Sequence, residues 1–318
     1  MTDTSVHPDA DPASLADIVA RQPSAHFAAL DQVGMRHIEM PLKLTLDGET
    51  CLLPAQVSAF VDLRDPTARG IHMSRLYRLS DEYLGRGALD VAGVRALLDA
   101  MLASHTGLSG RARLSIEFTL PLRRDSLRSG LSGWRQYPVR IDATLEDGRW
   151  RCEIGADVLY SSTCPGSAAM ARQVVRQQFL EKFGSGQVDA TAVADWLESP
   201  SGIAATPHAQ RSRARVQVAL ADDVDELPLV TLIDLIEATL ATPVQGAVKR
   251  VDEQEFACLN GENPMYCEDA ARRVRDALDA QPWIADYAID AAHFESLHPH
   301  DAVAQVVKGV AGGFGRSA

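Results

Sequence analysis

Cys164 stands where a cysteine side chain would be most reactive. The residues before it alternate between apolar and polar, as in a β-strand, and the residues after Pro165 have a helical pattern. A thiol just ahead of a helix N-terminus lies at the positive end of the helix dipole, which favours the thiolate. A thiolate binds a metal ion or attacks a carbon atom, whereas the alternative role of such a residue is packing as a small apolar side chain. Cys164 is therefore the first candidate for chemistry.

Other ionisable side chains in the second half of the chain fall where the pattern predicts loops or the ends of elements. They are His208, Lys249, Glu253, Glu268, Glu295 and His298. A thiolate, an imidazole and a carboxylate form the ligand set of a catalytic zinc-type site, which leaves one position for a water molecule. No local spacing rule joins Cys164 to His208 and Glu253, so a backbone-bonded imidazole and a solvated carboxylate remain alternatives. Glu268 has its own alternative, since a first-turn carboxylate also complements a helix dipole.

Two basic segments are candidates for binding phosphate. Lys249 begins a Lys-Arg pair, and Arg75 ends the segment 72–75, which also contains a histidine. Such exposed cations are more often solvated. The chain lacks the glycine-rich phosphate-binding motifs of dinucleotide-binding and P-loop proteins, so a nucleotide would be held by another device.

The elements that position these residues begin with two predicted β-hairpins. Alternating runs meet at Asp47-Gly48 and again at Asp147-Gly148, and Asp-Gly is a strong signal for a tight hairpin turn. Helical spacing follows each hairpin. The second half is expected to contain helices at about 168–182, 189–197, 229–240 and 265–279, with strands at about 213–221 and within 283–297. Asn263 is the expected N-cap of the last helix, with Pro264 in its first position.

The organisation predicted from this order is two similar modules in tandem. The polar stretch near residue 130 marks the join. The expected parts are a flexible N-terminal segment 1–20, a first module 21–130, a second module 131–310 with an insertion at about 184–206, and a C-terminal tail 311–318.

Composition excludes several kinds of partner. The formal net charge of −12 opposes a general nucleic-acid or anionic-membrane surface, which requires a positive field. No run approaches the roughly 18 apolar residues of a membrane-spanning helix, and the N-terminus lacks the pattern of a signal peptide. Five irregularly spaced cysteines fit reduced thiols better than disulfides. These features predict a cytoplasmic protein.

Taken together, the motifs resemble one family, the type IB GTP cyclohydrolases, over about residues 22 to 310. The likeness depends on the order and number of short segments rather than on any one of them. These segments are 21–24, 34–36, 72–75, 162–167, 207–212, 249–253, 262–264 and 294–298.

This resemblance implies the tunnelling fold, an α+β architecture. Two tandem modules would each form a four-stranded antiparallel sheet with a helix pair inserted midway, and the sheets would close into barrels on oligomerisation. The protein is accordingly expected to be a homo-oligomer, specifically a tetramer, with active sites at module or subunit interfaces.

The resemblance also assigns roles to the candidate residues. One divalent metal ion per active site, Zn, Mn or Fe, would be held by Cys164, His208 and Glu253. The catalytic residues would be Cys164, Glu268 and His298, of which the last two act as acid and base; Glu295 would anchor guanine, and Lys249 and Arg75 would bind the triphosphate. Many relatives have a second cysteine two residues after the first, where this chain has Gly166. A site with a single thiolate is therefore expected.

The implied reaction converts GTP into 7,8-dihydroneopterin triphosphate with release of formate, a first step toward folate, with queuosine as a second destination. Two alternatives stay open. An NADPH-dependent nitrile reductase of the same fold would use Cys164 as a covalent nucleophile and would not need His208 and Glu253 beside it. A non-catalytic, metal-stabilised oligomeric scaffold would need neither Glu268 nor His298.

Overall fold

The protein is described by a computed structural model, which covers residues 26–46 and 48–315. The expected segment 1–20, Asp47 of the first turn and the last residues of the expected tail lie outside the described residues. Eight strands follow one another in sheet order from β1 to β8, and the strand pairs whose register is defined are antiparallel. With the helices between the strands, this confirms an α+β fold built on an antiparallel sheet.

The chain divides into two compact units, which we call unit 1 and unit 2. Unit 1 contains the residues up to Ile116 together with Asp142–Trp150, and unit 2 contains Glu117–Ile141 and the residues from Arg151 onward. Strands β3 (Arg111–Asp125), β4 (Ser132–Glu146) and β5 (Arg149–Thr163) contribute residues to both units. The predicted join near residue 130 falls in the loop between β3 and β4.

In unit 1, a long hairpin forms from alternating sequence. Strands β1 (Leu30–Leu46) and β2 (Glu49–Leu63) pair from Leu46↔Glu49 outward, and their alternate apolar side chains, such as Leu42 and Val57, are fully buried. Helix α3 (Val91–Ser104), predicted from its spacing, is capped by Asp90, whose carboxylate accepts from the N–H of Gly93 at 2.6 Å. Helix α2 (Met73–Ser80) and the π-turn η2 (Asp81–Gly85) were not predicted.

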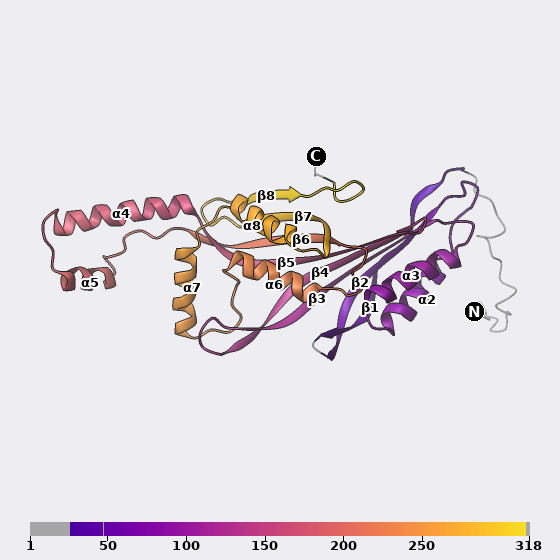
Figure 1. The fold of residues 1–318 in the computed structure, drawn as a ribbon, viewed down its shortest axis with the longest axis horizontal. Helices are drawn as coiled ribbons and strands as arrows, with labels where there is room; N and C mark the ends of the chain where they lie inside the picture. The colour runs from indigo at the N-terminus through magenta and orange to yellow at the C-terminus, as the bar shows by residue number, and fades with distance from the viewer. Residues whose placement is uncertain (1–25, 47, 316–318) are drawn as a thin grey trace, which may run out of the picture. The chain divides into compact units, whose positions relative to one another are not determined.

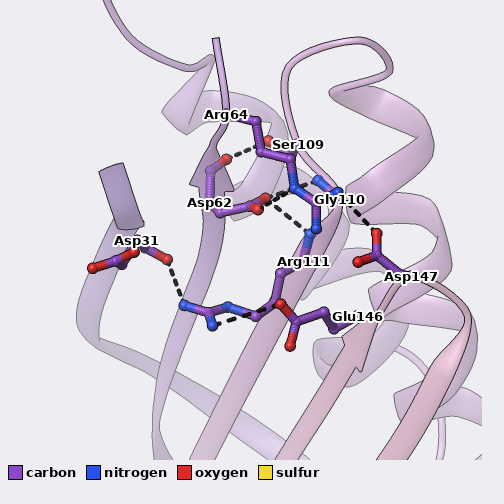
Figure 2. Close-up of polar contacts among 8 residues, drawn as sticks. All are labelled: Asp31, Asp62, Arg64, Ser109, Gly110, Arg111, Glu146 and Asp147. Carbon is purple, nitrogen blue, oxygen red and sulfur yellow. Dashed lines mark hydrogen bonds and ion pairs between the residues drawn. The ribbon is translucent and has the colours of Figure 1, made fainter. Parts of the chain in front are cut away.

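The end of β2 is tied to the start of β3 by one carboxylate, that of Asp62 (Figure 2). It accepts hydrogen bonds from the backbone N–H groups of Gly110 and Arg111, both at 2.8 Å, and from Nε of Arg64 at 2.7 Å. Arg64 also donates to Asp147 at 2.8 Å. Burial by itself would raise the pKa of Asp62, but the N–H of Arg111, Arg64 and the N–H of Gly110 outweigh it and lower the pKa. In the folded protein, Asp62 is therefore a buried carboxylate whose two oxygens both accept hydrogen bonds.

Replacing Asp62 with alanine is expected to destabilise the protein by about 2 kcal/mol, because two buried backbone donors lose their acceptor. Urea unfolding followed by circular dichroism measures the change. The matched control is Asp99→Ala, which removes an exposed carboxylate from α3 and is expected to shift stability by less than about 0.5 kcal/mol. Equal effects of the two substitutions would show that the Asp62 bonds contribute nothing specific.

Between the second hairpin's strands, β4 and β5, the turn has the geometry that Asp-Gly predicts. Asp147 and Gly148 both have positive φ, 48° and 80°. A two-residue turn of this hand matches the twist of the flanking strands. The prediction of this hairpin is confirmed.

Unit 2 continues with β6 (Ala209–Leu220), β7 (Ile284–His293) and β8 (Ala302–Val307). Helices α6 (Leu229–Leu240) and α8 (Cys267–Asp279) lie along these strands, whereas α4 (Pro165–Phe183) and α5 (Ala190–Glu198) extend away from them (Figure 1). Helix α6 packs against α8, which contacts β7 and β8. Both helices were predicted from their helical spacing, and each buries an apolar stripe: Leu232, Ile233 and Ile236 on α6, and Ala270, Val274 and Leu278 on α8. No helix in the described part of the chain is long and apolar enough to span a membrane.

The predicted start of α8 is wrong. Asn263 is the C-cap of a helix that was not predicted, α7 (Arg250–Glu262), and the N-cap of α8 is Tyr266. Asn263-Pro264 therefore stops one helix instead of starting the next, and proline is also common just after a helix C-cap. The run 283–297 likewise ends as a strand at His293, so Glu295 and His298 lie in the loop before β8.

The expected insertion lies between β5 and β6 and is itself helical. Helix α4 (Pro165–Phe183) precedes it, and helix α5 (Ala190–Glu198) forms within it, capped by Asp189. The two helices share an aromatic cluster in which the ring centroids of Phe183 and Trp196 are 5.6 Å apart and those of Phe179 and Trp196 are 6.1 Å apart. This segment therefore has a small apolar core of its own.

Candidate functional site

Cys164 occupies the position that the sequence predicts, at the N-cap of α4. Its Sγ accepts a long hydrogen bond, 3.5 Å, from the N–H of Ser167, and the residue is partly buried. The positive end of the helix thus faces the sulfur.

His208 lies directly beside Cys164. Strands β5 and β6 pair up to Thr163↔Ala209, so the residues that end β5 and begin β6 meet at one edge. The N–H of Cys164 donates to the carbonyl of His208 at 3.2 Å, and the N–H of His208 donates to Oγ of Ser167 at 3.1 Å. The first turn of α4 therefore holds both predicted ligands.

Glu295 reaches the same place from the loop after β7. Its Oε2 is 3.8 Å from Nδ1 of His208, and its side chain is 15% exposed. The N–H of Phe294 donates to the carbonyl of Arg211 at 3.1 Å, which fixes the start of this loop on β6. His208 thus contacts both Cys164, through the backbone, and Glu295, through its ring, at the edge where β5 and β7 end and β6 begins.

Behind this group runs a chain of buried polar side chains that sequence reasoning missed. Its members are Gln210, Ser162, Ser212, His293 and Tyr160. Gln210 bonds His208 Nδ1 at 2.9 Å and Ser162 at 2.8 Å; Ser162 lies 2.8 Å from Ser212 and 3.1 Å from His293 Nδ1; His293 Nε2 lies 2.9 Å from the hydroxyl of Tyr160. The only sequence signal was alternation, which indicates that residues at these positions share a face, but not that they bond one another.

Burial sets the protonation of this chain. It lowers the pKa of His293 to about 4, against the opposing attraction of Glu268 and Asp269, so this imidazole is neutral near pH 7. Burial likewise raises the pKa of Tyr160 far above its usual range. The chain is therefore a set of neutral hydrogen-bonding groups.

Glu268 stands in the first turn of α8, exposed and next to a buried thiol. Sγ of Cys267 donates to its Oε2 at 3.2 Å. The N–H of Glu268 itself, and then the thiol, lower the pKa of this carboxyl. Burial and the carboxylate raise the pKa of Cys267 to about 11. Glu268 is thus an ionised carboxylate in the free protein.

Glu253 and Lys249 lie at the N-terminus of α7, which a second buried carboxylate holds in place. Asp252 accepts from the N–H groups of Lys249 at 2.7 Å, Arg128 at 2.7 Å and Ser129 at 2.8 Å. Across residues 26–46 and 48–315, no three His, Cys, Asp or Glu side chains are grouped closely enough to hold a metal ion. The structure thus joins Cys164 with His208 but does not add Glu253 to them.

The remaining predicted residues lie elsewhere. His298 is exposed in the loop before β8, with its ring stacked on that of His300 at 5.0 Å. Arg75 belongs to unit 1, where it is exposed on α2 and donates to the carbonyl of Ser104 at 2.6 Å.

The missing side chain of Gly166 leaves space for the hydroxyl group of Tyr266. A β-carbon at this position would lie 3.0 Å from the hydroxyl of Tyr266 and 3.9 Å from Sγ of Cys164. A side chain at position 166 would therefore press against that hydroxyl, and the site as built has one thiol at this helix start.

The pair of donors fits a divalent metal ion in part. The thiol of Cys164 and the imidazole of His208 are sulfur and nitrogen donors of the kind that suits zinc. Nδ1 of His208 is already hydrogen-bonded to Gln210, and such a bond orients a metal-binding histidine. Cys164 and His208 would supply two ligands.

Comparison with known structures defines the class. The fold is similar to that of uricase from Arthrobacter globiformis, with a TM-score of 0.50 at 9% identity, covering 91% of this chain and 96% of that one. The protein is thus of the tunnelling-fold class. Within it, the family model for type I GTP cyclohydrolase folE2 matches residues 15–304. The chain belongs to the type I GTP cyclohydrolase FolE2 family.

Curated relatives agree over nearly their whole length. The chain is 49% identical to GTP cyclohydrolase FolE2 of Pseudomonas savastanoi pv. phaseolicola, covering 92% of this chain and 97% of the relative. It is 45% identical to GTP cyclohydrolase FolE2 of Hydrogenovibrio crunogenus, covering 94% and 96%.

Proposed function

We propose that the protein is a GTP cyclohydrolase that hydrolyses GTP at C8 of guanine to give 7,8-dihydroneopterin triphosphate and formate. Relatives that are 45% to 49% identical over most of the chain are named GTP cyclohydrolase FolE2. The observation in the structure that carries the proposal is the contact of His208 with both Cys164 and Glu295 at the edge where β5 and β7 end and β6 begins. Family membership favours hydrolysis over nitrile reduction.

Glu295 is proposed to anchor the substrate. Its carboxylate would accept hydrogen bonds from the ring N–H and the amino group of guanine, and charge-assisted bonds of this kind are strong where water is excluded. Glu268, ionised in the free protein, is proposed to take a proton from the attacking water, and His298 to return one as the imidazole ring of guanine opens. Such transfers contribute about 10²- to 10⁴-fold each to rate.

One divalent metal ion, Zn, Mn or Fe, is proposed at Cys164 and His208 with Glu253 as a third ligand. It would supply the Lewis acidity that makes a water molecule acidic enough to attack C8 of guanine. Cys164 would be the sole thiolate, because position 166 is glycine.

The assembly is also a proposal. We propose two tandem modules, 21–130 and 131–310, each of which combines antiparallel strands with helices. A homotetramer whose sheets close into barrels would cover the edges of β1 and β8. Lys249 and Arg75 are proposed to bind the triphosphate, and the product to enter folate synthesis, with queuosine as a second destination.

Metal-reconstituted protein should convert GTP into formate and a fluorescent dihydroneopterin. Separate samples loaded with Zn, Mn and Fe are incubated with GTP, and both products are measured. Absence of both products with all three metals would overturn the proposal. NADPH oxidation with a nitrile substrate would assign the alternative reductase chemistry instead.

A further inference from the structure

Gln210 is the member of the buried polar chain that contacts the ring of His208. It is on β6 and 7% exposed. Its amide spans two partners, with Oε1 at 2.9 Å from Nδ1 of His208 and Nε2 at 2.8 Å from Oγ of Ser162. The residue therefore touches the predicted ligand from the side of the protein interior.

The charges around His208 decide which ring nitrogen carries the proton. The carboxylate of Glu295 is 3.8 Å from Nδ1. A negative oxygen next to a lone pair is repulsive, whereas next to an N–H it is attractive, which favours the tautomer with the proton on Nδ1. Gln210 must then present its acceptor, Oε1, to this N–H, as the structure has it.

The other end of the amide is consistent with this assignment. The amide Nε2 of Gln210 can only donate hydrogen bonds, and Oγ of Ser162 accepts one from it. Ser162 is held in turn by Ser212 at 2.8 Å and His293 at 3.1 Å, all fully or nearly fully buried. The strand pairs Ser162↔Gln210 and Ser212↔His293 set these contacts. Gln210 is thus fixed by the sheet itself.

We propose that Gln210 is a positioning residue, which holds His208 as the Nδ1–H tautomer so that the lone pair of Nε2 is free for the metal ion. This rests on the proposed function in so far as the metal belongs to it. Because Oε1 of Gln210, 2.9 Å from Nδ1 of His208, accepts the Nδ1 proton, the carboxylate of Glu295, 3.8 Å from Nδ1, is left available for guanine. The bond that one nitrogen of a histidine makes determines what the other nitrogen can do.

The first test needs neither substrate nor a variant of Gln210. Full-length, metal-free protein labelled with 15N-histidine is examined by NMR, and the ring signals of His208 are assigned by their loss in His208→Gln. A protonated Nδ1 and an unprotonated Nε2 are expected. A protonated Nε2 with an unprotonated Nδ1 would overturn the proposal.

The second test measures zinc affinity by competition with a chelator, without GTP. Gln210→Leu is expected to weaken zinc binding by about 10- to 100-fold, as supporting partners of ligands do. Gln210→Glu keeps an acceptor for Nδ1–H and is expected to bind zinc far better than Gln210→Leu. Gln217→Leu, the same change elsewhere on β6, serves as the control and is expected to match the wild type.

Unchanged zinc affinity in Gln210→Leu would overturn the proposal, and so would an equal loss in Gln210→Leu and Gln210→Glu. Both readouts are independent of the cyclohydrolase assay. If formate is not formed but the tautomer and affinities are as expected, only the proposed function fails.

Discussion

Replacing Cys164 with serine should abolish dihydroneopterin formation and remove the bound metal ion. Serine keeps an oxygen that can cap α4, in place of the sulfur that accepts from Ser167. The helix start is therefore preserved while the thiolate is lost. Because partners that only support ligands already contribute about 10- to 100-fold, loss of a ligand is expected to cost at least on the order of 10³-fold in kcat/KM. Product fluorescence and metal content are measured on the same samples.

Cys258→Ser provides the matched control, since Cys258 is an exposed cysteine on α7. It should retain both activity and metal. Full activity in Cys164→Ser would refute the role of this thiolate. Loss of activity with metal retained would favour a nucleophilic cysteine instead.

Acidification should destabilise the protein through His293. Its pKa is about 4 in the folded protein and about 6.5 when unfolded, so the unfolded state binds the extra proton between these values. Stability from the neutral, buried imidazole is complete above pH 6.5 and falls as the pH drops to 4. The difference in pKa corresponds to about 3 kcal/mol. Urea unfolding at several pH values between 7.5 and 4 measures it.

Other groups also titrate between pH 4 and 7.5. The contribution of His293 is therefore read from the difference in the pH dependence of unfolding free energy between the wild type and its variants. His293→Gln should be less stable near neutral pH but should lose stability less steeply on acidification. His300→Gln, at an exposed histidine, should follow the wild-type pH dependence. Parallel pH profiles for the wild type and His293→Gln would show that His293 is not held neutral by burial.

Local patterns predicted the elements well where the determining contacts are close in sequence. The Asp147-Gly148 turn, the apolar stripe of α6 and the capping position of Cys164 all depend on a few neighbouring residues. Helix α7 was missed because the contacts that hold its first turn are distant in sequence. Its first turn is held by Asp252, which bonds residues more than one hundred positions away in the chain.

The candidate site shows the same limit more sharply. Family resemblance indicated His208 and Glu295, but no local pattern could place Gln210, Ser162 and His293 in one chain. Those contacts require the register of β5, β6 and β7, and a shift of one residue would turn each side chain to the opposite face. Register is a property of the assembled sheet.

The bond from the N–H of Cys164 to the carbonyl of His208 also closes the base of the long excursion that carries α4 and α5. The chain leaves the sheet at one proposed ligand and returns at the other, while Ser167 braces the junction. The bonds at the base of this excursion therefore do not depend on how long the segment beyond Ser167 is. We expect changes in the length of the outer segment to leave these bonds at its base in place.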